Sequence, residues 1–414
     1  MVGSNLIAQP DAGKRPVVFV HGFLASGDTY SNVITDLLER LYPQDKLFVF
    51  DWNSVSGSGK KNDSLLAAFI DKVLKKTKTR QIDLVAHSAG GMLARGYLID
   101  SSGASKVAHY VHLGSRKWFT ELPWFPNRKC LNIYSSADMV MGKAGGDVEG
   151  ATNIDLKDKD HYQVATCNET QNAIYNFFLD NDPPTDTYAI FMEYDAGGKA
   201  VWLGDNTPIS KASVKVFRVN PETGSRMSAK PLATFLTTGD GKWGPFRVSA
   251  IKKYYYEVEL TPPGRGQRII SYFLEPFTHP NNLIYLRGLP GEGMIKAMLG
   301  NLPENDKQSV AVIYSSSQAM IAGRDSVAIN DIPLTSPELA PASKTLISCF
   351  LYDNGDASAT GTALKQYKGS PFIGGLNISL PVSKTEGHTI YYNGRKMVLP
   401  AVSSKERILL AVFN

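Results

Sequence analysis

The sequence predicts an α/β domain built on a parallel sheet, followed by an all-β C-terminal region of one or two sandwiches or barrels. In the first part, apolar strand-like runs alternate with amphipathic helical patterns, which is typical of a parallel sheet covered by helices on both faces. A proline-rich break at residues 180–185 ends this part. Beyond it, short alternating runs between turn dipeptides indicate β-structure. We therefore expect domains at residues 1–183, 184–290 and 291–414, the last being a second sandwich or a continuation of the β module.

The elements of the first part follow from the spacing of its apolar residues. Short apolar runs bounded by turn residues predict strands, and apolar residues that recur every three or four positions predict helices. We expect strands at residues 17–20, 47–51, from 82 onward, 107–113, 130–135 and 153–156, and helices at residues 30–41, 65–74, 92–99 and 163–179.

The remainder of the chain contains almost no long helical pattern. Its apolar runs are short, and turn sequences such as Gly-Asp-Gly at residues 239–241 separate them, which favours strands. We expect strands at residues 212–218, 232–236, 254–260, 269–273, 310–314, 327–329, 346–352, 375–380, 389–392 and 408–413, and a short helix at 294–299.

Composition and charge exclude several classes of protein. A hydrophobic share of 43% and a charged share of 20% are ordinary for a globular chain. The net charge of +5 is small for 414 residues, and the basic cluster at residues 72–80 fits the solvated face of a helix, so we expect no nucleic-acid partner. No apolar run reaches about 18 residues, so we expect no membrane span.

A tight turn of small residues joins an expected strand to an expected helix at residues 84–91, Leu-Val-Ala-His-Ser-Ala-Gly-Gly. This is the context that a nucleophilic serine requires, because the turn lifts the hydroxyl of Ser88 above the carboxyl end of the sheet. Gly90 permits close approach of another backbone segment. The alternative is a turn that serves only packing, but the strand and helix on either side favour a nucleophile.

A His21-Gly22-Phe23 step follows the first long strand. This is the position at which α/β-hydrolases supply a backbone N–H to an oxyanion hole, and here that N–H belongs to Phe23. The second donor would be the N–H of Ala89, the residue after Ser88, at the positive end of the helix. A plain strand-to-helix turn at Gly22 is the alternative.

Ser88, Asp138 and His161 each follow an expected strand, in that order along the chain. Because the carboxyl ends of parallel strands meet at one edge of a sheet, we expect a nucleophile, an acid and a base to lie together there. His161 is the histidine that falls in a loop at this edge after a candidate acid; the others fall in the two turns, within a strand or in the later β-structure. Asp138 directly ends an apolar strand, which favours it over Asp155, Asp158 and Asp160 and over a turn role of its own.

Residues 114–128 form an expected loop with an unusual aromatic content. Its rings would lie beside the carboxyl edge of the sheet, where contact with an apolar ligand or an interface would explain them; capping of the core is the alternative. The loop after residue 52 is too short for a lid, so we expect the β-rich part to pack near the site and form part of the wall that binds substrate; a separate spacer or adhesion module is the alternative. The candidate substrate-binding residues are Trp52, Trp118, Phe119 and Trp124.

These motifs resemble a known family. His21-Gly22, Ala-His-Ser-Ala-Gly-Gly at residues 86–91 and Tyr-Ser-Ser-Ala-Asp-Met at residues 134–139 are similar to the minimal, lid-less bacterial lipases of the α/β-hydrolase fold, whose nucleophile motif also begins with alanine. This resemblance covers about residues 16–179. Asp-His-Tyr-Gln-Val at 160–164 and the later β-structure, anchored on Tyr-Phe-Leu-Glu-Pro-Phe at 272–277, look more like archaeal lipases with a C-terminal β-barrel module.

The resemblance implies hydrolysis of carboxylic esters, most simply acyl glycerols, through a serine acyl-enzyme, with a lipid or ester substrate that is met at a lipid–water interface. The chemistry needs no metal and no organic cofactor. A polyester or cutinase-like hydrolase and a catalytically idle hydrolase fold used for binding are the alternatives. Residues 1–16 lack the apolar core of a signal peptide, so we expect either a cytosolic protein or a sequence that is a mature or trimmed form. The resemblance favours a secreted enzyme.

Overall fold

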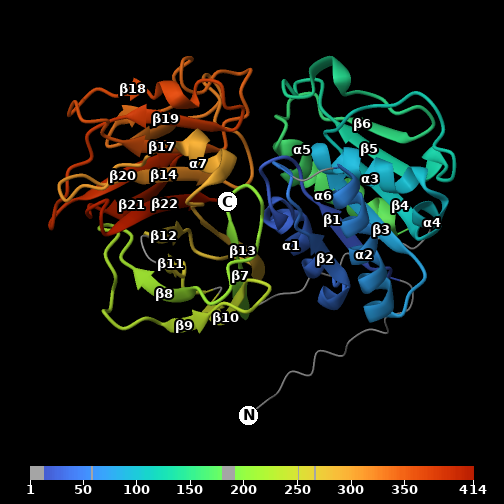
Figure 1. Cartoon of the computed structure of the whole chain (residues 1–414), viewed down its shortest axis with the longest axis horizontal. Coiled ribbons are helices and arrows are strands. Elements are labelled where there is room, and N and C mark those ends of the chain that lie inside the picture. The colour runs from blue at the N-terminus through green and yellow to red at the C-terminus, as the bar shows by residue number, and fades with distance from the viewer. Residues whose placement is uncertain (1–13, 57–58, 180–191, 250, 265–266) are drawn as a thin grey trace, which may run out of the picture.

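The computed structural model describes residues 14–56, 59–179, 192–249, 251–264 and 267–414 (Figure 1). The proline-rich break at residues 180–185, the expected boundary at 183 and most of the segment assessed for a signal peptide lie outside the described residues. Two parts follow one another along the chain: an N-terminal domain with a six-stranded sheet and its helices, and a β-rich region that comprises the described residues from 192 onward.

The sheet of the N-terminal domain is parallel throughout, as predicted. Its strand order is β2-β1-β3-β4-β5-β6. Every strand starts within one residue of its expected position. The four inner strands are short, mainly apolar runs that are mostly buried, whereas the edge strands β2 and β6 are only partly buried. The strands are β1 (Val17–Val20), β2 (Leu47–Phe50), β3 (Ile82–His87), β4 (Val107–Leu113), β5 (Cys130–Tyr134) and β6 (Thr152–Asp155).

Helices cover both faces of this sheet, and alternate residues of each strand supply the two cores. Val18 and Val20 of β1 pack with one cluster that includes Leu66, whereas Val17 and Phe19 pack with another. The first cluster lies under α2 and α3, and the second under α1 and α6. The helices are α1 (Ser31–Glu39), α2 (Gly59–Thr77), α3 (Ala89–Ile99), α4 (Ser101–Ser105), α5 (Gln163–Thr166) and α6 (Asn168–Phe178).

Two helices differ from the predicted ranges for identifiable reasons. The first turn and a half of α2 is polar and mostly exposed, so it carries no apolar period from which its start at Gly59 could be predicted. The single helix expected at residues 163–179 is two helices, because Cys167 has an extended backbone. At this break the Thr170 hydroxyl donates a hydrogen bond to the carbonyl of Val164.

The β-rich region is built around a nine-stranded mixed sheet, ordered β18-β19-β17-β14-β22-β12-β11-β8-β9. It includes strands from both sides of residue 290, since β12 pairs in parallel with β22. The strands are β8 (Ser213–Val219), β9 (Ala233–Leu236), β11 (Tyr255–Thr261), β12 (Ile269–Leu274), β14 (Ala311–Ser315), β17 (Ser348–Tyr352), β18 (Thr362–Ala363), β19 (Ile373–Asn377) and β22 (Arg407–Phe413).

Smaller elements cover the large sheet. A three-stranded sheet of β10 (Lys242–Ser249), β7 (Glu193–Trp202) and β13 (Asn281–Gly288) shares one core with it. A four-stranded sheet shares a second hydrophobic core with the large sheet, and helix α7 (Gly293–Leu299) packs on a third hydrophobic cluster. The four-stranded sheet consists of β16 (Ile332–Pro333), β15 (Val327–Ile329), β20 (Gly387–Tyr392) and β21 (Arg395–Pro400). A mostly β C-terminal region is therefore confirmed.

The sequence did not predict strands β7, β10, β13, β16, β18 and β21, and two of these contain residues that are uncommon within strands. Strand β7 contains Gly197 and Gly198, and β10 contains a Gly244-Pro245 step. Gly198 has a local reason: a Cβ atom there would overlap the carbonyl oxygen of Ile284 on the neighbouring β13. Glycine is thus required for the close approach of two strands, which composition alone does not reveal. No helix among the residues listed above as described is long and apolar enough to cross a membrane.

Acid pH is expected to destabilise the fold through its buried histidines. His388 accepts a hydrogen bond from Asn330 at Nδ1 (3.4 Å), and its Nε2 lies 3.1 Å from the Ser309 hydroxyl, which itself donates to Val402. This environment suits the neutral ring, and burial lowers the pKa of His388 to about 4. The unfolded chain binds the proton near the ordinary histidine value of about 6.5.

Because the folded-state pKa of His388 lies below the unfolded value, its contribution to stability is complete above about pH 6.5 and is lost as the pH falls towards about 4. The slope from one such group is at most about 1.4 kcal/mol per pH unit. Urea unfolding of the wild type and of His388→Gln, repeated across this window, should show a shallower decline for the variant. Equal slopes would contradict the assignment.

Candidate active site

Ser88 occupies a strained turn between β3 and α3. Its backbone has φ 53° and ψ −122°, a conformation that non-glycine residues rarely adopt and that is characteristic of a nucleophile elbow. Three hydrogen bonds fix the turn: the Ser88 N–H donates to Leu113, and its carbonyl accepts from the Gly91 N–H and the Ser115 hydroxyl. These bonds hold the backbone of Ser88 in place, and none of them uses its hydroxyl.

Gly90 lies where the helix α3 meets strand β1. A Cβ atom at this position would lie 2.5 Å from the carbonyl oxygen of Val20 and would also overlap that of His21. These are backbone atoms of the segment that leads to Phe23, so they cannot move aside without displacing it.

Gly90→Ala is expected to destabilise the domain by about 1–3 kcal/mol through overpacking and to lower any activity of the site. The matched control is Gly96→Ala on the same helix, where a Cβ would have only an ordinary contact at 3.6 Å with Asp63. Because alanine is the better helix former, the control should be neutral or stabilising by up to about 1 kcal/mol. Thermal unfolding of both variants tests this pair; similar melting temperatures would contradict the steric argument.

The structure brings Ser88, His161 and Asp138 together in a hydrogen-bonded chain. His161 Nε2 lies 2.9 Å from Ser88 Oγ, and His161 Nδ1 lies 2.7 Å from Asp138 Oδ2. The side chains of His161 and Asp138 are each 2% exposed, so solvent competes little for these bonds. This is the geometry in which a carboxylate orients an imidazole that can accept a proton from a hydroxyl.

Asp138 is held as a charged acceptor. Its Oδ1 accepts the backbone N–H groups of Val140 (2.9 Å) and Met141 (3.0 Å), and its Oδ2 faces His161. Burial acts to raise its pKa, but the hydrogen bond and charge of His161 and the N–H of Met141 outweigh burial and lower it. A charged Asp138 keeps the proton of the imidazole on Nδ1, which leaves Nε2 available to the serine.

The other candidate acids are occupied elsewhere. Asp155 accepts the backbone N–H of Ser136, Asp158 is exposed beside Lys159, and Asp160 accepts the N–H groups of Tyr162 and Gln163. Asp138 alone among these four aspartates is hydrogen-bonded to the His161 ring in the structure.

Two buried histidines, His21 and His87, support the site, and no sequence pattern indicated these roles. The Nε2–H of His87 donates to the backbone carbonyl of His161 (2.9 Å), and burial, with the charge of His161, lowers the pKa of His87 to about 3. His21 contacts the carbonyl of Gly22 through Nδ1 and accepts the N–H of Trp52 at Nε2. Burial lowers the pKa of His21 as well, so both rings are neutral at neutral pH.

The segment that carries Phe23 passes directly beside Ser88. A Cβ atom on Gly22 would lie 3.0 Å from the Cβ of Ser88. Ala89, the second candidate donor, is the first residue of α3. The Phe23 ring is 38% exposed and packs against Phe372 of the β-rich region, with ring centroids 6.2 Å apart.

The four candidate substrate-binding aromatics divide into two pairs. Trp52 is buried and donates its indole N–H to the carbonyl of His21, and Trp118 is buried in the core cluster beneath α2 and α3. Phe119 and Trp124 have exposed fractions of 66% and 64%. Trp118 therefore caps the core, whereas Phe119 and Trp124 of the same loop reach the surface.

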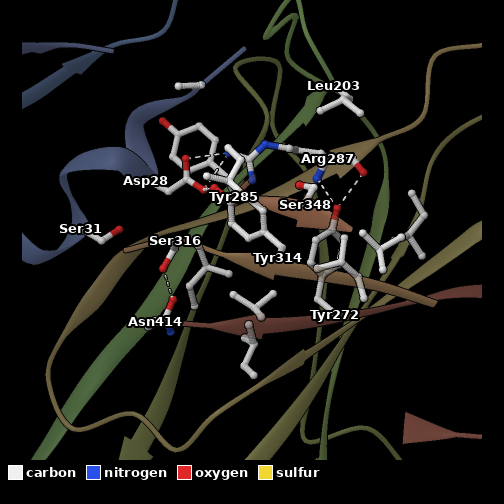
Figure 2. Close-up of a pocket in the computed structure, with 18 of the residues that line it drawn as sticks. Asp28, Ser31, Leu203, Tyr272, Tyr285, Arg287, Tyr314, Ser316, Ser348 and Asn414 are labelled. Atoms are coloured by element: carbon white, nitrogen blue, oxygen red, sulfur yellow. Dashed lines mark hydrogen bonds and ion pairs between the residues drawn. The ribbon is translucent and has the colours of Figure 1, made fainter. Parts of the chain in front are cut away.

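A cavity of about 100 Å³ lies where the N-terminal domain meets the β-rich region (Figure 2). Leu24, Ala25, Asp28 and Tyr162 line it from the N-terminal domain. The β-rich region contributes mostly apolar side chains, among them Leu203, Leu289, Val312, Phe350, Phe372 and Ile373. Leu24, the residue after Phe23, is thus one of the side chains that line the cavity.

One wall of this cavity is polar and tightly hydrogen-bonded. Arg287 on β13 donates to both carboxylate oxygens of Asp28 at 2.7 Å, and the Tyr314 hydroxyl contacts the same carboxylate at 3.3 Å. Figure 2 shows these groups converging from both parts of the chain. Both members of the ion pair are mostly buried, so this contact fixes the two parts relative to one another.

Comparison with known families agrees with this architecture. Residues 15–134 match the family model described as alpha/beta hydrolase fold, and residues 193–289 match the model described as lipase C-terminal domain. The chain is therefore an α/β-hydrolase that carries a lipase C-terminal domain, and the family assigned from the sequence is confirmed at this level.

Among solved structures, a lipase of Bacillus licheniformis in its mature form is 18% identical, with a TM-score of 0.34, over 41% of this chain and 94% of the lipase. The naproxen esterase of Bacillus subtilis is 12% identical (TM-score 0.30; 41% and 85% covered). An α/β serine hydrolase without a lid from Xanthomonas campestris is 16% identical (TM-score 0.29; 43% and 87% covered).

Proposed function

We propose that the protein hydrolyses carboxylic esters, with acyl glycerols as its substrate class, through an acyl-enzyme formed on Ser88. The observation that carries this proposal is the hydrogen-bonded chain from Ser88 through His161 to Asp138 at the carboxyl edge of the sheet. The lipase C-terminal domain supports a lipid ester rather than another acyl compound.

The reaction needs only side chains, backbone N–H groups and water. Ser88 Oγ attacks the ester carbonyl carbon while its proton passes to His161 Nε2, and the N–H groups of Phe23 and Ala89 stabilise the oxyanion. The carbon–oxygen bond to the alcohol then breaks, and His161 returns the proton to that alcohol. Water attacks the acyl-enzyme with His161 as base, and the carboxylic acid leaves as Ser88 regains its proton.

Several exposed apolar side chains lie in the two connections that leave the carboxyl edge of the sheet after β4 and β5. Phe119 and Trp124 follow β4, and Met139 follows Asp138 at the end of β5, with an exposed fraction of 59%. Apolar groups at the carboxyl edge suit contact with a lipid surface. We propose that the enzyme meets its substrate at a lipid–water interface through this edge.

The cavity between the two parts is the proposed acyl site. Its lining is mainly apolar, it includes Leu24 and Ala25 from the segment that carries the proposed oxyanion donor Phe23, and the β-rich region supplies most of its surface. Phe372 lines it and also contacts the Phe23 ring, so this side chain would touch an acyl chain near the reacting carbon.

Phe372→Ala is expected to lower kcat/KM for long-chain esters by about tenfold relative to short-chain esters, because an aromatic contact of roughly 1.5–3 kcal/mol is lost. Hydrolysis of a series of esters of increasing acyl length, with triglyceride and polyester included, measures this ratio. Tyr391→Ala, an exposed aromatic on β20, is the control and should leave the ratio unchanged. An unchanged ratio in Phe372→Ala would refute the acyl site, and preferred cleavage of polyester would favour the cutinase-like alternative.

A further inference from the structure

The β-rich region contacts the two loops on which the proposed chemistry depends. One is the His161 loop, which we define as residues 158–163; the other is the oxyanion loop, residues 21–26. The contacts are made by Ala319 and Arg324 to the first loop and by Asn206 to the second. The polar side chains that make these contacts, Asp160, Arg324 and Asn206, are buried or half-buried.

Both carboxylate oxygens of Asp160, the residue directly before His161, have bonding partners. Oδ1 accepts the N–H groups of Tyr162 (2.8 Å) and Gln163 (2.9 Å), which fixes the turn that carries His161. Oδ2 accepts the N–H of Ala319 (3.1 Å) and pairs with Arg324 Nη1 (2.8 Å). One 5%-exposed side chain thus links the turn to the β-rich region.

Arg324 is itself held rigidly within the β-rich region. Its guanidinium donates to the carbonyl of Ala319 (2.6 Å) and to Asp325 Oδ2 (2.9 and 3.0 Å). Asp325 in turn accepts from the Ile321 N–H and from the side chains of Gln318 and Asn393. Arg324 Nη1 also reaches Gln163 Oε1 (3.0 Å), the atom that accepts the Asp160 N–H. The guanidinium of Arg324 is therefore already oriented, by groups of the β-rich region, to bind Asp160 and Gln163 of the His161 loop.

Asn206 holds the oxyanion loop in a similar way. Its Oδ1 accepts the Ser26 hydroxyl (2.6 Å), which orients the amide. Its Nδ2 then faces the carbonyls of Ala25 (2.8 Å) and Trp52 (3.2 Å) and the Nε2 of His21 (3.2 Å). Asn206 is 6% exposed, so these bonds are made away from solvent.

From these contacts we infer that the β-rich region is part of the catalytic apparatus: Arg324 positions the His161 loop and Asn206 positions the oxyanion loop. Neither side chain touches the reacting atoms, so both are positioning residues. The inference rests on the proposed function of Ser88 and deepens it. A shift of about 1 Å in a catalytic group can cost on the order of a hundredfold in rate, which makes such positioning measurable.

The test uses the full chain and a small fluorophosphonate, whose reaction with Ser88 requires the base and the oxyanion hole but no acyl site. Arg324→Gln is expected to lower the rate constant of labelling, and kcat for a short soluble ester, by roughly tenfold to a hundredfold while KM changes little. Arg324→Lys, which keeps the charge, should recover part of this loss. Asn206→Asp, which retains the acceptor for Ser26 but replaces the donor, should also slow labelling.

Two comparisons separate positioning from general stabilisation. Asp160→Asn combined with Arg324→Gln should be no slower than the slower single variant, because both act through one contact. Glu39→Gln, which alters the contact of Glu39 with His279 between the same two parts of the chain but touches neither loop, should label at the wild-type rate.

Labelling of Arg324→Gln and Asn206→Asp at the wild-type rate, with only a lower melting temperature, would overturn the inference. If Arg324→Gln does not fold, Arg324→Lys and Asn206→Asp carry the test by the same criterion. A wild-type protein that does not label at all would instead overturn the proposed function, so the two failures are distinguishable.

Discussion

Replacing Ser88 by alanine is expected to lower kcat for ester hydrolysis by on the order of 10⁶. The hydroxyl is the proposed nucleophile, and no other hydroxyl is placed against His161 Nε2 at 2.9 Å in the part of the chain that the structure describes. The fold should remain, because the turn is held by bonds to the backbone of Ser88 from Leu113, Gly91 and Ser115.

Hydrolysis of a short soluble ester, measured with the melting temperature of each variant, tests this expectation. Ser136→Ala is the control, because Ser136 is exposed and lies close to Asp138 in the sequence. It should keep wild-type activity. A Ser88→Ala protein that retains more than a few per cent of activity would show that Ser88 is not the nucleophile.

Replacing Asp138 by asparagine is expected to lower kcat by on the order of 10⁴. The N–H groups of Val140 and Met141 hold Oδ1, so the amide nitrogen of asparagine would take the place of Oδ2 and face His161 Nδ1. Nδ1 would then be an acceptor and the imidazole proton would move to Nε2. An imidazole in that tautomer cannot take the proton of Ser88.

The same assay on Asp155→Asn, Asp158→Asn and Asp160→Asn provides the comparison. Asp155 and Asp158 have no contact with the His161 ring in the structure, so their variants should stay near the wild type. Asp160→Asn should lose activity through the loop but less than Asp138→Asn. A mild effect at Asp138 together with a large one at Asp155 or Asp158 would reassign the acid.

Much of the N-terminal domain could be predicted from sequence because its signals are local. Each inner strand is a mainly apolar, mostly buried run, and the turn at Ser88 combines a strand, small residues and a helix within a few positions. The meeting of Ser88, Asp138 and His161 at one edge then follows from the geometry of a parallel sheet, because each of them follows a strand. In the structure, His161 lies within hydrogen-bond distance of Ser88 on one side and of Asp138 on the other.

What could not be predicted depends on contacts between distant segments. Gly197 and Gly198 of strand β7 are explained only by the close approach of β10 and β13, respectively. The links from Arg324 to Asp160 and from Asn206 to Ala25 join residues that are far apart in the chain, and each looks like an ordinary polar loop residue in the sequence. Loops have no period, so the sequence could not tell that Trp118 is buried whereas Trp124 is exposed.

Titration of the full chain with a fluorophosphonate, followed by mass spectrometry of its peptides, tests whether Ser88 is a nucleophile activated by His161. We expect one phosphonyl group per chain, carried by Ser88, with loss of activity in proportion to labelling, and greatly slowed labelling in His161→Ala. Absence of labelling, or a label on a different residue with Ser88 unmodified, would contradict it.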